Sequence, residues 1–155
     1  MPSKNHLIKL IENDDWESLE FLLDHTKLTY QLNKKINWSN TLLNIVIKNK
    51  KINCLKILLK HPNIQNCFCV LSKRNKICLD MGIQTNNIQI IQLLLEHPQI
   101  HLCLDIKSDD GYTPLDLITL LPTNIKIYQI YMEIKRWNAR KWWILGCTEC
   151  LINID

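Results

Sequence analysis

The chain has 155 residues, enough for one domain with a hydrophobic core, and its 46% hydrophobic and 22% charged residues are typical of a globular protein rather than a disordered chain. Its 3 glycines and 5 prolines exclude collagen-like and linker-like sequences and fit a turn-rich all-β fold poorly. The formal net charge of +4 is too small by itself to hold a nucleic acid or an anionic membrane surface.

The cysteines and the first residues predict the compartment. The chain has 7 cysteines, an odd number that cannot pair completely, and residues 1–6 are not an apolar leader. No run of about 18 apolar residues, the length needed to cross a bilayer, occurs in the sequence. We therefore expect free thiols in a reducing compartment, a cytoplasmic protein and no membrane partner.

A repeat of 36 residues organises the chain, because the segment 57–64 (ILLKHPNI) recurs at 93–100 (LLLEHPQI). Further residues keep the same spacing: Leu7, Leu43, Leu79 and Leu115; His25, His61 and His97; Thr41, Ile77 and Thr113. Independent markers in one register argue against a chance match. They predict a single domain over residues 1–148. Its repeats lie at about 5–40, 41–76, 77–112 and 113–148, followed by a tail or the start of a truncated fifth repeat at 149–155.

Each repeat is predicted to contain two helices joined by a polar turn. In the second repeat, apolar residues in 42–47 and 52–59 recur at helical spacing on either side of the polar residues 48–51. Pro62 follows the second helix, and proline cannot continue the helical hydrogen-bond ladder. The third repeat shows the same pattern 36 residues later. Because such short helices are marginal alone, we expect neighbouring repeats to share one core.

The fourth repeat is less regular. Residues 121–124 are predicted to form the turn between its helices, and the second helix continues to Trp137. The run 142–145 (WWIL) is apolar, whereas the outer face at the end of a repeat array is normally polar. We expect this end either to fold back on the protein or to be covered by a partner.

Residues 109–117 (DDGYTPLDL) resemble the signature of the ankyrin-repeat family, which opens the first helix of a repeat. The resemblance implies that Gly111 supplies a turn, Thr113 caps the helix, Pro114 occupies its first turn and Leu115 enters the core. It also implies the fold class, which is all-α: an ankyrin-like α-solenoid of four helix-pair repeats with a 36-residue period.

The other repeats depart from the family pattern. Leu42 and Cys78 replace the proline of the Thr-Pro pair, and His-Pro replaces the glycine after the second helix. The period exceeds the roughly 33 residues of the family, so the loops should be longer. Ala139 is the single alanine among abundant Ile, Asn and Lys, which indicates an AT-rich genome. An intracellular ankyrin-like protein of this kind fits a large DNA virus, with a place in the host cytoplasm or nucleus, or an intracellular parasite.

The resemblance implies a non-enzymatic protein–protein interaction module, expected to be a monomer without a cofactor. Such modules display a concave surface of loop tips and first-helix edges. Trp38 and Tyr112 are the predicted anchors, because aromatic residues dominate binding hot spots, and the alternative for Trp38 is a place in the core. The predicted partner-binding residues are Asn37, Trp38, Asn40, Lys48, Lys73, Arg74, Lys76, Gln84, Asp109, Asp110 and Tyr112.

The charge pattern and a short motif suggest partners. The basic cluster 73–76 lies in a predicted projecting loop and favours an acidic partner surface. Nucleic acid is disfavoured, because acidic residues occupy the next loop, at 105–110, and interrupt the basic stripe. Residues 121–125 and the following helix weakly resemble the F-box-like segment that ends some viral ankyrin proteins. The alternative function is therefore a substrate adaptor that recruits a ubiquitin ligase.

A metal-binding or redox protein is the second rival class, and the spacing of the cysteines disfavours it. Cys67 and Cys69 lie two repeats away from Cys147 and Cys150, about 20 Å along a stack, which is too far for one zinc site. The other cysteines are expected in the core. The three in-register histidines are expected to meet helix-terminal carbonyls. No nucleophile, phosphate-loop or metalloprotease motif occurs, so we do not expect an enzyme.

Overall fold

The computed structural model describes residues 3–25, 34–35, 40–62, 64, 68, 70–72, 76–121 and 125–136. Within these ranges the protein is helical and contains no strand, apart from one bridge residue at Asn40. The predicted all-α class is therefore confirmed for the described residues. None of the described helices is long and apolar enough to cross a membrane.

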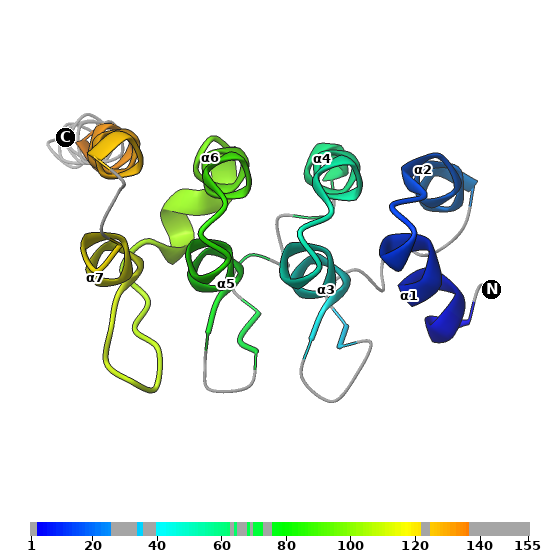
Figure 1. Ribbon diagram of the computed structural model, residues 1–155, viewed down its shortest axis with the longest axis horizontal. Coiled ribbons are helices and arrows are strands. Elements are labelled where there is room, and N and C mark those ends of the chain that lie inside the picture. The colour runs from blue at the N-terminus through cyan, green and yellow to red at the C-terminus, as the bar shows by residue number, and fades with distance from the viewer. Residues whose placement is uncertain are drawn as a thin grey trace, which may run out of the picture.

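Short helices follow one another along the chain (Figure 1). In order they are α1 (Lys4–Glu12), α2 (Trp16–His25), α3 (Leu42–Lys48), α4 (Ile52–Lys60), α5 (Cys78–Gln84), α6 (Ile88–Leu95), the 3-10 helix η3 (Pro98–Cys103), α7 (Pro114–Thr119) and a last helix over residues 125–136. The predicted helices at 42–47 and 52–59 are confirmed as α3 and α4. The helix α4 ends two residues before Pro62, as the sequence predicts.

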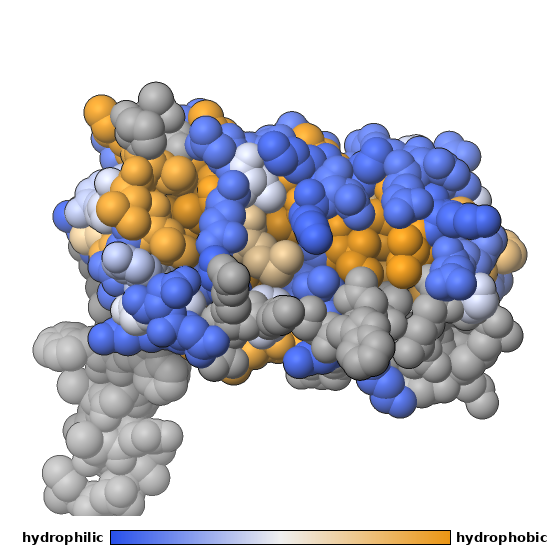
Figure 2. Space-filling model, turned by 60° about the horizontal axis from the view of Figure 1, so that its bottom comes forward, coloured by the Kyte–Doolittle hydropathy of each residue, from blue (hydrophilic) through white to orange (hydrophobic). Residues whose placement is uncertain are grey.

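The helices form two layers (Figure 1). One layer contains α1, α3, α5 and α7, and each of these helices contacts the next one in the layer. The second layer contains α2, α4, α6 and the helix 125–136; in it, α4 contacts both α2 and α6. The loop before α7 extends away from the second layer and flanks one side of the first layer. Figure 2 turns this side forward and shows hydrophilic side chains separating apolar patches on it.

The core is continuous through both layers. Leu43 of α3 and Leu79 of α5 occupy the same register position and are completely buried. The helix α3 buries six of its seven residues. Burying one leucine or isoleucine contributes about 2 kcal/mol, so packing rather than intrinsic propensity stabilises helices this short. Leu115, expected to enter the core, is only partly buried in α7.

Equivalent backbone features recur along the described chain. The first residues of α3, α5 and α7 are spaced by 36, at Leu42, Cys78 and Pro114. Three turns between paired helices contain a residue with positive φ, also spaced by 36: Asp14 (55°), Lys50 (55°) and Asn86 (52°). A left-handed residue lets the chain reverse sharply after each first helix.

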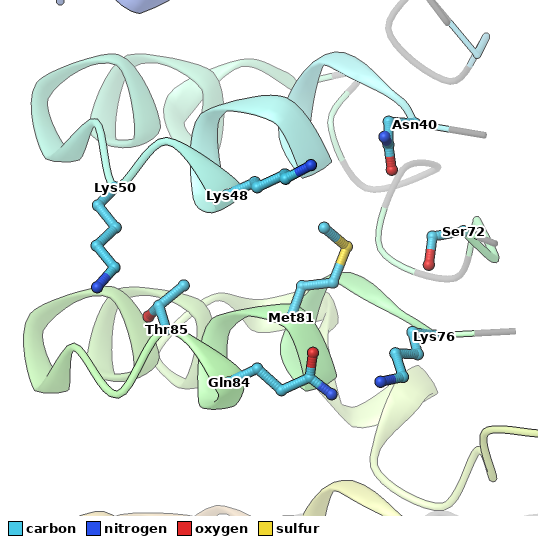
Figure 3. A pocket seen from close by; sticks show the side chains of 8 residues that line it. All are labelled: Asn40, Lys48, Lys50, Ser72, Lys76, Met81, Gln84 and Thr85. Carbon is cyan, nitrogen blue, oxygen red and sulfur yellow. The ribbon is translucent and has the colours of Figure 1, made fainter. Parts of the chain in front are cut away.

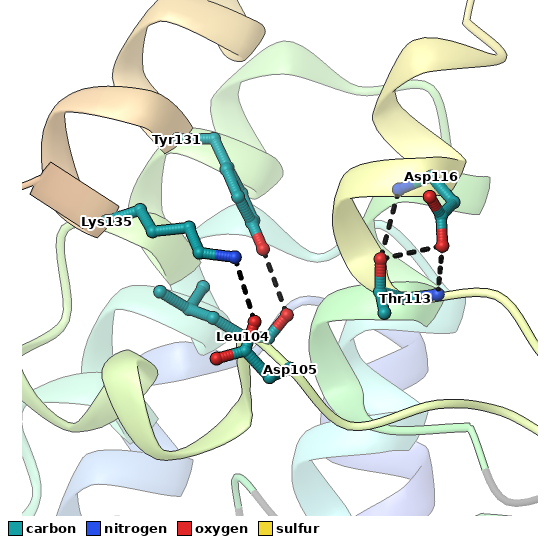
Figure 4. Close-up of polar contacts among 6 residues, drawn as sticks. All are labelled: Leu104, Asp105, Thr113, Asp116, Tyr131 and Lys135. Atoms are coloured by element: carbon teal, nitrogen blue, oxygen red, sulfur yellow. Dashed lines mark hydrogen bonds and ion pairs between the residues drawn. The ribbon is translucent and has the colours of Figure 1, made fainter.

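The start of α7 agrees with the expected turn and cap (Figure 4). Gly111 has a φ of 80°, a conformation that glycine adopts without strain. The Thr113 hydroxyl accepts the Asp116 backbone N–H at 3.3 Å, and the Asp116 carboxylate accepts the Thr113 N–H at 2.8 Å. Pro114 occupies the first turn, where a missing N–H costs nothing.

Two polar contacts attach the last helix to the loop after η3 (Figure 4). The Tyr131 hydroxyl donates to the Leu104 carbonyl at 2.9 Å, and the Lys135 amine pairs with the Asp105 carboxylate at 2.9 Å. Ile127 and Tyr131 are completely buried. The helix 125–136 therefore belongs to the same core as the preceding helices.

The in-register histidines do not share one role. His25 bonds to the Phe21 carbonyl of its own helix at 3.0 Å, as expected. His97 has an additional role that was not expected, because its Nδ1 accepts the Gln99 N–H at 3.2 Å and thereby caps η3. Its other nitrogen donates to the Leu59 carbonyl of α4, which ties one helix pair to the next. Burial lowers the pKa of His97, so the ring is neutral near pH 7.

Candidate partner-binding groove

A hollow of about 460 Å³ lies between α3 and α5 on the side flanked by the loops (Figure 3). We call it the groove. Its lining residues are Asn40, Lys48, Lys50, Ser72, Lys76, Met81, Gln84 and Thr85. Lys48 and Gln84 end α3 and α5, and Met81 lies in the middle of α5. The remaining lining residues lie in the turns after these helices or in the segments before them.

The 36-residue register explains why these side chains converge. Lys48 and Gln84 are the last residues of α3 and α5 and occupy equivalent positions. Asn40 and Lys76 are also equivalent, because each precedes the N-cap residue of its helix. Since α3 and α5 contact each other side by side, each pair of equivalent residues faces the same hollow from two neighbouring helices.

A short backbone bond closes the base of the loop on one side of the groove. The Ser72 N–H donates to the Lys76 carbonyl at 2.9 Å. The next loop has the same closure, from the Ser108 N–H to the Tyr112 carbonyl at 3.0 Å. These bonds fix where Lys76 and Tyr112 leave their loops.

The middle of the groove contains an apolar side chain. Met81 extends from α5 toward α3 (Figure 3). Lys50 and Thr85 lie at one end, while Asn40, Ser72 and Lys76 lie at the other. A flexible thioether adapts to differently shaped apolar groups, so Met81 is suited to contact a partner side chain.

The groove is positively charged. Three of its eight lining residues are lysines and none is acidic. The carboxyl of Asp80 in α5 interacts electrostatically with the Lys76 amine, but Asp80 is completely buried and does not line the groove. Burial raises the pKa of Asp80 to about 6, and Lys76 opposes part of this rise.

The structure brings four of the predicted site residues together: Asn40, Lys48, Lys76 and Gln84. Asp109, Asp110 and Tyr112 are exposed in the loop before α7, one repeat away, and do not line the groove. The predicted site residues Asn37, Trp38, Lys73 and Arg74 lie outside the described residues.

Sequence reasoning missed Lys50, Ser72 and Met81 as lining residues. Lys50 follows the helix end by two residues, and its positive φ directs its side chain differently from that of a helical residue. Met81 belongs to the apolar pattern of α5, which hides its partial exposure. The signal that could have found Ser72 is its spacing of 36 from Ser108, which precedes the loop before α7.

The described cysteines are not a reactive or metal-binding site. Cys54, Cys78 and Cys103 are buried and form no disulfide, as expected. Burial, together with the nearby carboxylate of Asp14, raises the pKa of Cys54 to about 12, so its thiol is a poor nucleophile. In the described part of the chain, no three potential ligands group around a metal position. Cys67, Cys69, Cys147 and Cys150 lie outside the described residues.

The comparisons with known proteins do not assign this groove. No protein-family model matches the chain, and no curated protein matches it. The function has to be argued from the residues and their arrangement.

Proposed function

We propose that the protein is an ankyrin-like α-solenoid of four helix-pair repeats that acts as a non-enzymatic interaction module and holds a protein partner in the groove. The observation that carries the proposal is the groove itself. Equivalent residues of two successive helix pairs line one hollow and leave Lys48 and Gln84 exposed in it. Repeat proteins use such a surface, shared between neighbouring units, to bind partners.

Three features support the repeat architecture within this proposal. The helices α3, α5 and α7 start at positions spaced by 36 residues, and the left-handed turn residues keep the same spacing. The helices form two layers with contacts between neighbours. The segment 109–117 has the turn and helix cap that the family resemblance implies. Together they favour stacked helix pairs of one kind.

The loop before α7 extends the proposed binding surface. Tyr112 is 45% exposed, and Asp109 and Asp110 are exposed next to it. Aromatic side chains that are partly exposed on a rigid backbone contribute strongly to protein interfaces. A partner that fills the groove and continues toward α7 would contact Tyr112.

The ubiquitin-ligase alternative receives no specific support. It depends on an apolar helix after residue 121, but Ile127 and Tyr131 are completely buried in the core. A ligase subunit would therefore have to bind through the remaining exposed side chains, such as Tyr128, or displace the helix.

Affinity capture with two matched double variants tests the proposal. Met81→Ala with Gln84→Ala removes two groove side chains, one partly buried and one exposed. Gln129→Ala with Met132→Ala makes the same two changes at the same spacing on the last helix. We expect partners of the wild-type chain to be lost by the groove variant and kept by the control variant, with both folded by circular dichroism. Loss of ligase subunits by the control variant alone would instead favour the adaptor.

A further inference from the structure

The three groove lysines are positioned to receive negative charge. Lys48 and Lys50 are exposed at the end of α3 and in the turn after it, and Lys76 is partly exposed at the base of the loop before α5. Among the described residues, none of these three amines is in an ion pair. Three cations and no carboxylate around one hollow give it a positive potential, which attracts an anionic partner.

The groove also offers contacts that a simple anion does not use. Met81 provides an apolar surface at its middle, and Gln84 provides an exposed side-chain amide beside it. An extended peptide presents backbone N–H and C=O groups to such an amide and apolar side chains to such a thioether. The combination fits a peptide better than a free phosphate.

The neighbouring loop limits the length of the negative segment. Asp109 and Asp110 are exposed in the loop before α7, one helix pair away from the lysines. Adjacent packed helices are about 10 Å apart, so a uniformly anionic chain that followed the row of loops would soon meet these carboxylates. This charge order disfavours a nucleic acid or an anionic membrane surface.

We propose that the groove takes a short acidic segment of a partner protein, whose carboxylates lie at Lys48, Lys50 and Lys76 and whose apolar side chain contacts Met81. This inference rests on the proposed function, since it names the chemistry of the groove's occupant. The lysines accelerate and strengthen the encounter, whereas Met81 and Gln84 select the peptide.

A selection from an unbiased library of 12-residue peptides on phage tests the inference with the full-length wild-type chain. We expect enriched peptides to contain several Asp or Glu residues and one large apolar residue. In fluorescence polarisation, we expect Lys48→Glu with Lys76→Glu to weaken their binding about tenfold or more. The control Lys9→Glu with Lys126→Glu makes the same charge change at two exposed lysines outside the groove. We expect it to change affinity less than about twofold, with circular dichroism verifying that all variants fold.

The other outcomes separate the inference from the proposed function. If the enriched peptides are neutral or basic but the groove variant does not bind them, the inference of an acidic segment is wrong and the proposed binding groove is supported. Peptides that respond equally to both variants would overturn both. Failure to enrich any peptide would overturn the short linear segment, and affinity capture would then decide the function separately. A fluorescent 12-nucleotide dT strand that binds as tightly as the peptides, with the same dependence on Lys48 and Lys76, would assign the groove to nucleic acid.

Discussion

The starts of α5 and α7 are equivalent in register but differ in chemistry. Both helices have an aspartate three residues after the N-cap, Asp80 in α5 and Asp116 in α7. The α7 cap is Thr113, which makes reciprocal hydrogen bonds with exposed Asp116. The α5 cap is Ile77, which has no hydroxyl. Asp80 accepts the Ile77 N–H at 3.2 Å through Oδ2, while its buried Oδ1 has no partner among the described residues.

The difference shows how burial changes the contribution of an aspartate to the stability of the fold. Hydrogen bonds from Thr113 lower the pKa of Asp116, which is exposed, whereas burial raises the pKa of Asp80 to about 6. Ionisation of Asp116 in α7 therefore favours the folded state, whereas ionisation of the equivalent Asp80 in α5 opposes it. The larger burial of α5 offsets this loss, since α5 buries five of its residues and α7 buries two.

The largest expected effect on stability comes from core burial, which is greater in α5 than in α7. Leu79→Ala in α5 should lower the free energy of unfolding by about 3 kcal/mol, because Leu79 is completely buried. Leu115→Ala, at the equivalent position of α7, should cost about 1 kcal/mol, since Leu115 is only partly buried. Urea unfolding followed by circular dichroism measures both, and equal losses would contradict the proposed difference between the middle and the end.

The next largest effect is a gain in stability from a substitution at Asp80. Asp80→Asn should raise the free energy of unfolding by about 2 kcal/mol at pH 7, because it removes a buried charge and keeps an acceptor for Ile77. The raised pKa means that wild-type stability should fall as the pH rises from 4 to 6, and the variant should lose this slope. A variant that is less stable than the wild type at pH 7 would show that the Asp80 carboxylate has a stabilising partner.

Gly82→Ala tests how tightly α5 packs on α6. A Cβ at position 82 would lie 2.6 Å from the Leu94 Cδ1 atom, so Leu94 must move. We expect a loss of about 1 kcal/mol despite the better helix propensity of alanine. Thermal unfolding measures the change, and a rise in melting temperature would show that Leu94 moves without loss of packing.

A change of similar size is expected at the cap of α7. Thr113→Val should lower the free energy of unfolding by about 1 kcal/mol, because the Asp116 N–H loses its acceptor. Ile77→Val, the matched change in α5, removes one methylene and no hydrogen bond; its loss, also about 1 kcal/mol, should not depend on capping. Amide hydrogen exchange distinguishes the two: the first turn of α7 should lose protection and that of α5 should not.

The sequence predicts much of the described fold because its signals are local. The apolar spacing in 42–47 and 52–59, the proline at 62 and the cap at Thr113 each act within one helix or one turn, and the structure contains all of them. The burial of Asp80 could not be predicted, since it depends on what packs above the start of α5 rather than on the residues beside it.

The candidate site was predictable only in part for a related reason. The register identifies Lys48 and Gln84 as equivalent, and it placed them correctly on one surface. The register does not indicate which residues of the turns line the hollow between neighbouring helices, so sequence reasoning missed Lys50. His97 meets a helix-terminal carbonyl as expected, but that carbonyl belongs to Leu59 of the preceding helix pair, which local sequence signals do not indicate.

Photo-crosslinking from the groove tests the central claim most directly. Gln84, exposed in the groove, and Gln129, exposed on the last helix, are replaced in turn by benzoylphenylalanine in the full chain, and each protein is irradiated in cell lysate. The account predicts protein crosslinks from position 84 that excess wild-type chain suppresses, and few from position 129. Crosslinks of equal strength from both positions, or none from position 84, would contradict a partner-binding groove between α3 and α5.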